Sequence, residues 1–253
     1  MILTILGSGT CVPSKKRGSP ANFLKNAGNN ILVDCGPGTL RQMENAGIDY
    51  RDLDYLFVTH FHSDHIADLI PLLQALNWTP GFKRKKKLTI VGPVGLSKSY
   101  NSLLQLFPGA SPRNYKIEVV EMQPGTRSKK GAFIVETLKT KHSNESIAYK
   151  FEAEDKKLVI SGDCGYDTDL AEFAKNADVL VLECSFLRGF PDGHLNAGQC
   201  GAIASMACPK KLVLTHLYPP FSESERLDEV KSFFADTTTN ATIVAEDLMR
   251  IRI

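Results

Sequence analysis

The chain of 253 residues is 43% hydrophobic and 23% charged, with a formal net charge of +2, which is typical of a globular protein with a substantial core. This charge neither requires nor excludes a polyanionic partner. No run approaches the roughly 18 apolar residues of a membrane-spanning helix, and the N-terminus lacks the basic flank and cleavage site of a signal peptide. The six scattered cysteines form no Cys-x-x-Cys pair, which indicates reduced thiols. We therefore expect a cytoplasmic protein without a membrane partner.

Short runs of aliphatic and β-branched residues recur along the chain and predict strands, with helix-like segments between them. Several runs are apolar at consecutive positions, as in sheets covered on both faces, and no Pro-, Gly- or Ser-rich linker divides them. We predict one α/β domain over residues 1–253, with two similar halves that meet near residue 120. In chain order, the predicted strands are 2–6, 30–34, 55–59, 88–91, 116–121, 133–139, 147–152, 157–161, 179–183 and 211–215, and the predicted helices are 38–46, 64–77, 94–107, 167–176, 196–207 and 223–234.

Five predicted strands end in a residue that can bind a metal or transfer a proton. These residues are Asp34, His60, Asp163, Glu183 and His216. In layered α/β folds, functional sites gather where strands end in loops. We therefore expect the five residues to share one rim.

The stretch Val58–Ile66, VTHFHSDHI, contains three of the six histidines. If the chain is extended between the first two, His60 and His62 point the same way and can hold one ion together. A helix that begins near Asp64 would turn Asp64 and His65 toward a second position. Imidazole and carboxylate are ligands that zinc prefers, with iron and manganese as alternatives. A chance meeting of polar loop residues is the other interpretation, but the spacing favours a metal site.

Two ions need more ligands than this stretch supplies. His142 and His216 follow predicted strands, and Asp163 lies in the turn SGDCG, where its two oxygens could bridge both ions. Taken singly, a core histidine with satisfied partners or a turn-forming aspartate is the commoner interpretation. Beside the histidine-rich stretch, we expect the three residues to complete the ligand sets.

The order of these motifs resembles the metallo-β-lactamase superfamily, and longer stretches resemble ribonuclease Z. ILGSGTCVPSKKRGSPANFL, LVDCGPGTLRQMENAGID and LFVTHFHSDHIADL carry the resemblance in the first part of the chain. HSNESIAYKFE, LVISGDCG, VLVLECSF, HLNAGQCGAIA and KKLVLTHLYP continue it in the same order. The resemblance implies an αββα sandwich of two mixed sheets between helices, a homodimer, and two divalent ions, with zinc implied and Mn²⁺ or Fe²⁺ as alternatives.

The resemblance also implies two sets of metal ligands that share one carboxylate. The implied ligands are His60, His62 and His142 for one ion, Asp64, His65 and His216 for the other, and Asp163 between the two.

The implied reaction is the hydrolysis of a phosphodiester. A hydroxide between two ions ~3.5–4 Å apart is nucleophilic at neutral pH, and Asp64 could accept its proton. His194 would protonate the departing alkoxide, with Glu183 holding its imidazole, and Asp34 would orient a ligand imidazole. The alternatives are an exposed loop histidine for His194 and a turn former for Asp34.

One departure from ribonuclease Z bears on the substrate. That family usually carries a protruding basic arm that grips transfer RNA, whereas here only residues 143–162 separate the third and fourth metal motifs, and they read as strand, turn and strand. Two enzymatic interpretations therefore stay open: an endonuclease acting on RNA 3′ ends, and a hydrolase of a cyclic nucleotide or of a sulfate or carboxylic ester. A metal-stabilised binding protein without activity is a third, which the complete ligand set disfavours.

Two groups of basic residues are candidates for contacts with substrate phosphates. One group lies in the loop after the first predicted strand, where ribonuclease Z has Pro-x-Lys-x-Arg-Asn and this chain has glycine in place of the asparagine. The other is the run FKRKKKL at 82–88. A solvated loop is the alternative for both groups. The candidates are Lys15 and Arg17 in the first group and Lys83, Arg84 and Lys85 in the second.

Overall fold

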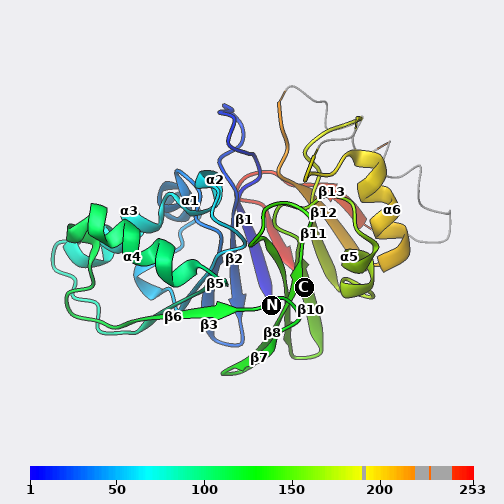
Figure 1. Ribbon diagram of the computed structural model, residues 1–253. Coiled ribbons are helices and arrows are strands. Elements are labelled where there is room, and N and C mark those ends of the chain that lie inside the picture. The colour runs from blue at the N-terminus through cyan, green and yellow to red at the C-terminus, as the bar shows by residue number, and fades with distance from the viewer. Residues whose placement is uncertain (190–191, 220–227, 229–240) are drawn as a thin grey trace.

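The computed structural model describes residues 1–189, 192–219, 228 and 241–253. Within these residues, two seven-stranded sheets pack face to face, and helices cover both outer faces (Figure 1). The predicted αββα sandwich is confirmed. The helix predicted over residues 223–234 lies almost entirely outside the described residues.

The first sheet has the strand order β14-β1-β2-β3-β4-β5-β6 and is mixed. Its strands β3 to β6 run parallel to one another, while β1 is antiparallel to both of its neighbours. The strands are β1 (Ile2–Gly7), β2 (Ala21–Asn26), β3 (Asn29–Val33), β4 (Tyr55–Phe57), β5 (Leu88–Pro93), β6 (Ile117–Met122) and β14 (Arg250–Arg252).

The second sheet has the order β13-β12-β11-β10-β9-β8-β7, with β10 to β13 parallel. The chain passes into it after Met122, near the predicted meeting point of two halves; the single-domain organisation stays a prediction. All ten predicted strands are present, and the sequence patterns missed β2, β7, β13 and β14. The strands are β7 (Arg127–Lys130), β8 (Phe133–Lys139), β9 (Ile147–Ala153), β10 (Lys156–Ile160), β11 (Val179–Glu183), β12 (Lys211–Thr215) and β13 (Ala241–Val244).

Helices α1 to α4 lie on the flank of the first sheet, and α5 and α6 lie on the opposite flank, against the second sheet (Figure 1). The helix predicted over 64–77 is wrong in one respect, because it is two helices. Asp68 lies between them, and its backbone N–H donates to the carbonyl of Cys35 at 2.9 Å, which redirects the chain. The helices are α1 (Thr39–Asn45), α2 (Ser63–Ile66), α3 (Leu69–Trp78), α4 (Leu96–Leu106), α5 (Thr168–Phe173) and α6 (Ala197–Ala207), with 3₁₀ turns η1 (Tyr50–Asp52) and η2 (Pro108–Ala110).

Apolar side chains fill the space between the sheets and the space under each helical layer. Neighbouring residues of a strand point to opposite faces, so Leu32 packs under the helices while Ile31 and Val33 face the other sheet. Because both faces are covered, the strands are apolar at consecutive positions. Among the described residues, the helices are all too short or too polar to cross a bilayer.

The parallel strands determine where the polar strand-end residues lie. Val33 pairs with Phe57 in the first sheet, and Glu183 pairs with Thr215 in the second. Parallel strands in register end at the same edge of a sheet. The residues that follow these strands therefore gather at one rim of the sandwich.

Candidate metal centre

The histidine-rich stretch leaves β4 and turns into α2. His62 has an extended backbone and precedes the first residue of α2, and the helix carries Asp64 and His65. The backbone N–H of Cys35 donates to the carbonyl of His65 at 2.7 Å. A Cβ on Gly36 would lie 1.9 Å from the carbonyl oxygen of Asp64, so only glycine permits this contact. These contacts hold Cys35 and Gly36, which follow β3, against Asp64 and His65 in the stretch that follows β4.

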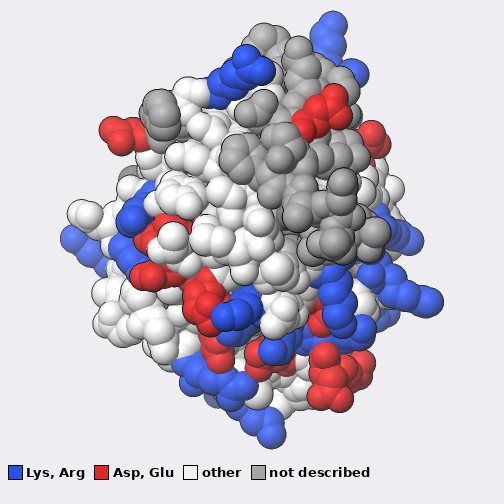
Figure 2. Space-filling view, turned by 90° about the vertical axis from the view of Figure 1, so that its right-hand side faces the viewer, with Lys and Arg blue, Asp and Glu red and all other residues white. Residues whose placement is uncertain are grey.

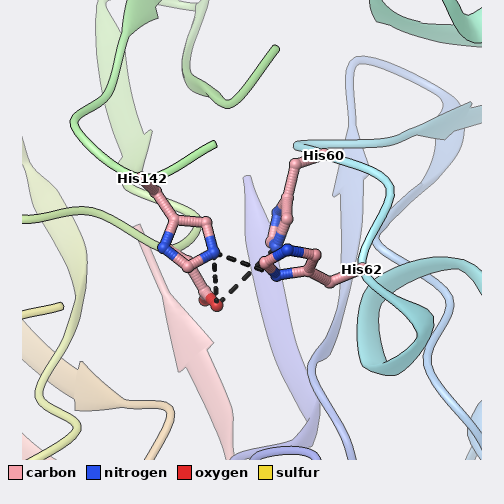
Figure 3. Close-up of side chains that lie close together, drawn as sticks. His60, His62 and His142 are labelled. Carbon is pink, nitrogen blue, oxygen red and sulfur yellow. Dashed lines mark hydrogen bonds and ion pairs between the residues drawn. The ribbon is translucent and has the colours of Figure 1, made fainter. Parts of the chain in front are cut away.

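Histidines from two loops converge on a first position. His142 lies after β8, and its Nε2 is 3.0 Å from Nδ1 of His62. Figure 3 shows the rings of His60, His62 and His142 pointing toward one another, with His142 on the opposite side from the other two. Together with Asp163, they offer ligand atoms that all lie within 4.8 Å of one another.

A second group lies beside the first. Asp64, His65 and His216 also offer ligand atoms within 4.8 Å of one another. Oδ2 of Asp64 is 3.7 Å from Nε2 of His65 and 3.6 Å from Nε2 of His216. His216 has a left-handed backbone, with φ of 56°, which is uncommon for a residue other than glycine and often marks a functional site.

Asp163 lies between the two groups, with one oxygen toward each. Its Oδ2 is 3.7 Å from Nε2 of His60 and 3.7 Å from Nε2 of His142. Its Oδ1 is 3.2 Å from Nε2 of His65 and 3.3 Å from Nε2 of His216. The arrangement is the one a bridging carboxylate needs.

The cluster fits divalent cations. The Nε2 atoms of His60, His65 and His216 are buried and have no hydrogen-bond partner among the described residues, and Oδ1 of Asp163 is in the same condition. Buried polar atoms are nearly always hydrogen-bonded, so four such atoms without a hydrogen bond in one cluster fit the ligand set of a cation. Burial lowers the pKa of His60, and the charge of His65 adds to the effect, which keeps the imidazole in its neutral, metal-binding form.

His65 shows how strongly this cluster attracts positive charge. Burial lowers its pKa, but the carboxylates of Asp163 and Asp34 outweigh burial and raise the pKa well above the ordinary value. The surroundings therefore favour an added positive charge at this position, and a divalent ion supplies one.

Two buried carboxylates accept hydrogen bonds from imidazoles of the cluster. Asp34, which follows β3, accepts a hydrogen bond from Nδ1 of His65 at 2.8 Å. Glu183, the last residue of β11, is 1% exposed and accepts from Nδ1 of His194 at 2.8 Å and from the backbone N–H of Cys164 at 2.9 Å. Each carboxylate fixes the orientation of the imidazole that it binds.

His194 lies over the second group, with its ring stacked on His216 at 5.4 Å between centroids. Burial lowers the pKa of His194, but the hydrogen bond and charge of Glu183 outweigh it, and the pKa lies above the ordinary value. His194 also lies within 4.8 Å of donor atoms of Asp163 and His216. It can therefore act as a proton donor or as a further ligand.

Sequence reasoning missed three groups that contact the imidazoles. The carbonyl of Gly193 accepts from Nδ1 of His142 at 2.8 Å, and the hydroxyls of Thr59 and Ser185 contact two other histidines. Thr59 directly precedes the histidine motif, and Ser185 lies two residues after Glu183, the last residue of β11. Their positions close to predicted site residues were the only sequence signal for this role.

The loop after β1 rises above the sheets at the rim (Figure 1). It carries Lys15, which is exposed, and Cys11, whose Sγ lies 3.5 Å from the hydroxyl of Tyr218. Nη1 of Arg17 donates to Oγ of Ser8 at 2.6 Å and to the carbonyl of Ala245, so Arg17 anchors the base of this loop. Phosphate contacts by Lys15 and Arg17 stay predictions.

Arg84 is buried and cannot contact a substrate phosphate as predicted, whereas Lys83 and Lys85 are exposed and their phosphate contacts stay predictions. The run lies before β5, at the end of the sheet opposite the rim, and the six residues of β5 separate the two ends by about 20 Å at about 3.3 Å per residue. Arg84 is 2% exposed, and its guanidinium donates to the carbonyls of Arg51, Leu53 and Lys87 at 2.5 to 3.0 Å. The sequence of this basic run does not indicate that the side chain of Arg84 is buried.

Arg84→Met is expected to lower the free energy of unfolding by about 3 kcal/mol and to leave kcat/KM unchanged. The substitution leaves buried carbonyls without their charged donor, and hydrogen bonds to charged groups contribute about 1.5–3 kcal/mol each. Urea unfolding measures the effect, with Lys85→Met as the exposed control. A loss of activity in folded Arg84→Met would restore a role in substrate binding.

Comparison with known protein families matches residues 29–217 to the β-lactamase superfamily domain. The chain belongs to this superfamily. It is 29% identical to a ribonuclease Z of Archaeoglobus fulgidus, over 99% of this chain and 97% of the relative. The alignment spans 308 positions, more than the 253 residues of this chain, so the relative contains segments that this chain lacks.

Solved structures have the same fold. YhfI of Bacillus subtilis, a metallo-β-lactamase fold protein, has a TM-score of 0.86 and 24% identity, over 99% of this chain and 98% of that chain. The short form of human tRNase Z has a TM-score of 0.78 and 24% identity, over 100% of this chain and 99% of that chain. With the ribonuclease Z relatives, the superfamily membership identifies a metal-dependent hydrolase that uses divalent ions.

Removing the ions with a chelator is expected to lower the melting temperature, and adding them back should restore it. A ligand that binds only the folded state at 100 times its Kd stabilises that state by about 2.7 kcal/mol. Differential scanning calorimetry with and without chelator measures the shift. The double variant His60→Ala/His216→Ala is the control. An equal shift in that variant would contradict binding by this cluster.

Proposed function

We propose that the chain is a zinc-dependent phosphodiesterase of the ribonuclease Z type that binds two ions in the cluster at the rim. The observation that carries this proposal is the hydrogen bond of 2.8 Å between Glu183 and His194, which lies directly beside the donor atoms of Asp163 and His216. A metal-binding cluster alone is compatible with many hydrolytic reactions. A buried carboxylate that holds a protonatable imidazole next to it adds a general acid.

Two divalent ions, when bound, would lower the pKa of a water molecule and neutralise charge on a phosphodiester. We propose that Asp64 accepts the proton of the attacking water. Burial raises the pKa of Asp64, but the nearby imidazoles of His216 and His65 outweigh it and hold the pKa below its ordinary value. The side chain is therefore an acceptor at neutral pH.

His194 would donate its Nε2 proton to the departing oxygen. Its Nδ1 is bound to Glu183, so Nε2 is the ring nitrogen left to donate to a leaving group. The raised pKa keeps the ring protonated nearer to neutral pH. Glu183 therefore orients the imidazole and stabilises its charged form.

We propose RNA as the first substrate class, cleaved at 3′ ends, because the curated relatives are named ribonuclease Z. An open cleft of about 620 Å³ beside His142 has room for a nucleotide. Figure 2 shows Lys and Arg interspersed with Asp and Glu on the flank of α5 and α6, so the described part of that face is not a continuous basic surface. The cleft is lined by Lys139, Thr140, Lys141, His142, Ser143, Asn144, Asp192 and Gly193.

A small phosphodiester such as a cyclic nucleotide is the second candidate. The connection between His142 and Asp163 is the short hairpin of β9 and β10, which leaves no segment there for a protruding arm. Without an arm at this connection, the described part of the site recognises its substrate through the rim itself, which favours a small molecule.

The test uses zinc-loaded protein, a transfer RNA precursor with a 3′ trailer and, in parallel, a cyclic nucleotide. A single cut after the discriminator base that Asp64→Ala abolishes would support the RNA substrate. Turnover of the cyclic nucleotide alone would move the function to the second candidate. No turnover of either substrate by protein with two bound ions would contradict the proposed phosphodiesterase. The homodimer and the cytoplasmic location belong to the same proposal.

A further inference from the structure

A hydroxyl residue stands beside the carboxylate of Asp34. The backbone N–H of Thr59 donates to Oδ1 of Asp34 at 2.8 Å, and its Oγ1 donates to Oδ2 at 2.9 Å. The same Oγ1 lies 3.0 Å from Nδ1 of His60. Asp34 thus holds His65 directly and holds His60 through the threonine.

The same arrangement occurs in the second sheet. The backbone N–H of Ser185 donates to Oε2 of Glu183 at 3.3 Å, and its Oγ donates to that oxygen at 2.6 Å. Oγ of Ser185 lies 2.9 Å from Nδ1 of His216. Glu183 thus holds His194 directly and holds His216 through the serine.

The chemistry of these groups determines which way each hydrogen bond runs. An ionised carboxylate only accepts, so each hydroxyl directs its one proton to the carboxylate and accepts from the imidazole. His60 and His216 must then carry their proton on Nδ1, which leaves a lone pair on Nε2. Both Nε2 atoms are buried and have no hydrogen-bond partner among the described residues, and both face Asp163.

We propose that Thr59 and Ser185 are positioning residues that fix the tautomer and orientation of one metal-binding imidazole each. Thr59 acts through His60 on the ion of the first group. Ser185 acts through His216 on the ion of the second group. The inference rests on the metal sites of the proposed function, and it is independent of the substrate.

The test measures metal affinity. Thr59→Val and Ser185→Ala each remove one hydroxyl and keep the backbone N–H. Groups that hold a metal-binding histidine affect metal affinity by about 10–100-fold. Competition with a chelator, with bound zinc counted by mass spectrometry, should show one weakened ion and one unchanged ion in each variant.

Two backgrounds identify which ion is weakened. In a His216→Ala chain, which should retain the ion of the first group, Thr59→Val should lower the remaining affinity and Ser185→Ala should not. In a His62→Ala chain the pattern should reverse. This crossed result is one that a general loss of stability would not produce.

Conservative and remote substitutions complete the design. Thr59→Ser and Ser185→Thr keep the hydroxyl and should restore the affinity to within about threefold, well inside the range expected for its loss. Thr137→Val removes a buried hydroxyl in β8 that donates to the carbonyl of Gln123 at 2.7 Å, and it should leave both affinities unchanged.

Unchanged affinities in folded Thr59→Val and Ser185→Ala would overturn the inference, and so would a loss that Thr59→Ser does not restore. A parent chain that binds fewer than two ions would overturn both this inference and the proposed function. A parent chain that binds two ions and cleaves no phosphodiester would contradict the proposed function. The metal affinities of the variants would still decide the roles of Thr59 and Ser185.

Discussion

Asp163→Ala is expected to weaken both metal ions together and to lower kcat/KM by at least about 10³-fold. Each carboxylate oxygen of Asp163 faces a different group of imidazoles, so one substitution removes a ligand from both. Metal ions contribute several kcal/mol of transition-state stabilisation, and each 1.36 kcal/mol corresponds to a factor of ten in rate. Zinc content after dialysis and the rate of phosphodiester cleavage measure the two effects.

Two other carboxylates serve as controls for Asp163. Asp64→Ala removes a donor from the second group only and should leave one ion bound. Asp178 is buried but pairs with Lys156 and Lys210, so Asp178→Ala should retain both ions. Loss of a single ion in Asp163→Ala would show that the carboxylate belongs to one site and does not bridge.

His194→Ala is expected to lower kcat by about 10²–10⁴-fold, the usual contribution of a general acid, with both ions retained. The loss should depend on the leaving group. A phosphodiester that releases an alkoxide needs the proton, so its cleavage should show the full effect. One that releases 4-nitrophenolate does not need the proton, and its cleavage should change little.

Glu183→Gln is the companion variant, and its effect is on the pH profile. Activity requires protonated His194 and therefore falls as pH rises through the pKa of His194. Burial lowers this pKa and Glu183 raises it by more, so removing the charge of Glu183 should move the fall to lower pH. An unmoved pH profile would contradict the role of His194 as general acid. Loss of an ion from His194→Ala would show that His194 is a metal ligand.

Much of the site was predictable because its residues follow recognisable strands. Asp34, His60, Glu183 and His216 stand at the ends of apolar runs, and parallel strands end at one edge. The pairing of His142 with His62 at 3.0 Å was less accessible, since the two are 80 residues apart. Only the resemblance to a known family placed them in one ligand set.

The features that escaped prediction depend on tertiary contacts. Thr59 and Ser185 are common residue types, and only the folded arrangement puts their hydroxyls between a carboxylate and an imidazole. Strand β7 reads RSKK without an apolar residue, and it pairs with β8 while Arg127 contacts Glu136 and Glu152. Such an edge strand has no hydrophobic periodicity to reveal it.

The measurement that tests the account most directly is an anomalous diffraction map of zinc-loaded crystals at the zinc edge. We predict two peaks per chain. One should lie among His60, His62 and His142, and the other should lie between Asp64 and His216, with Asp163 bridging them. A single peak, or peaks away from this rim, would contradict a two-ion centre.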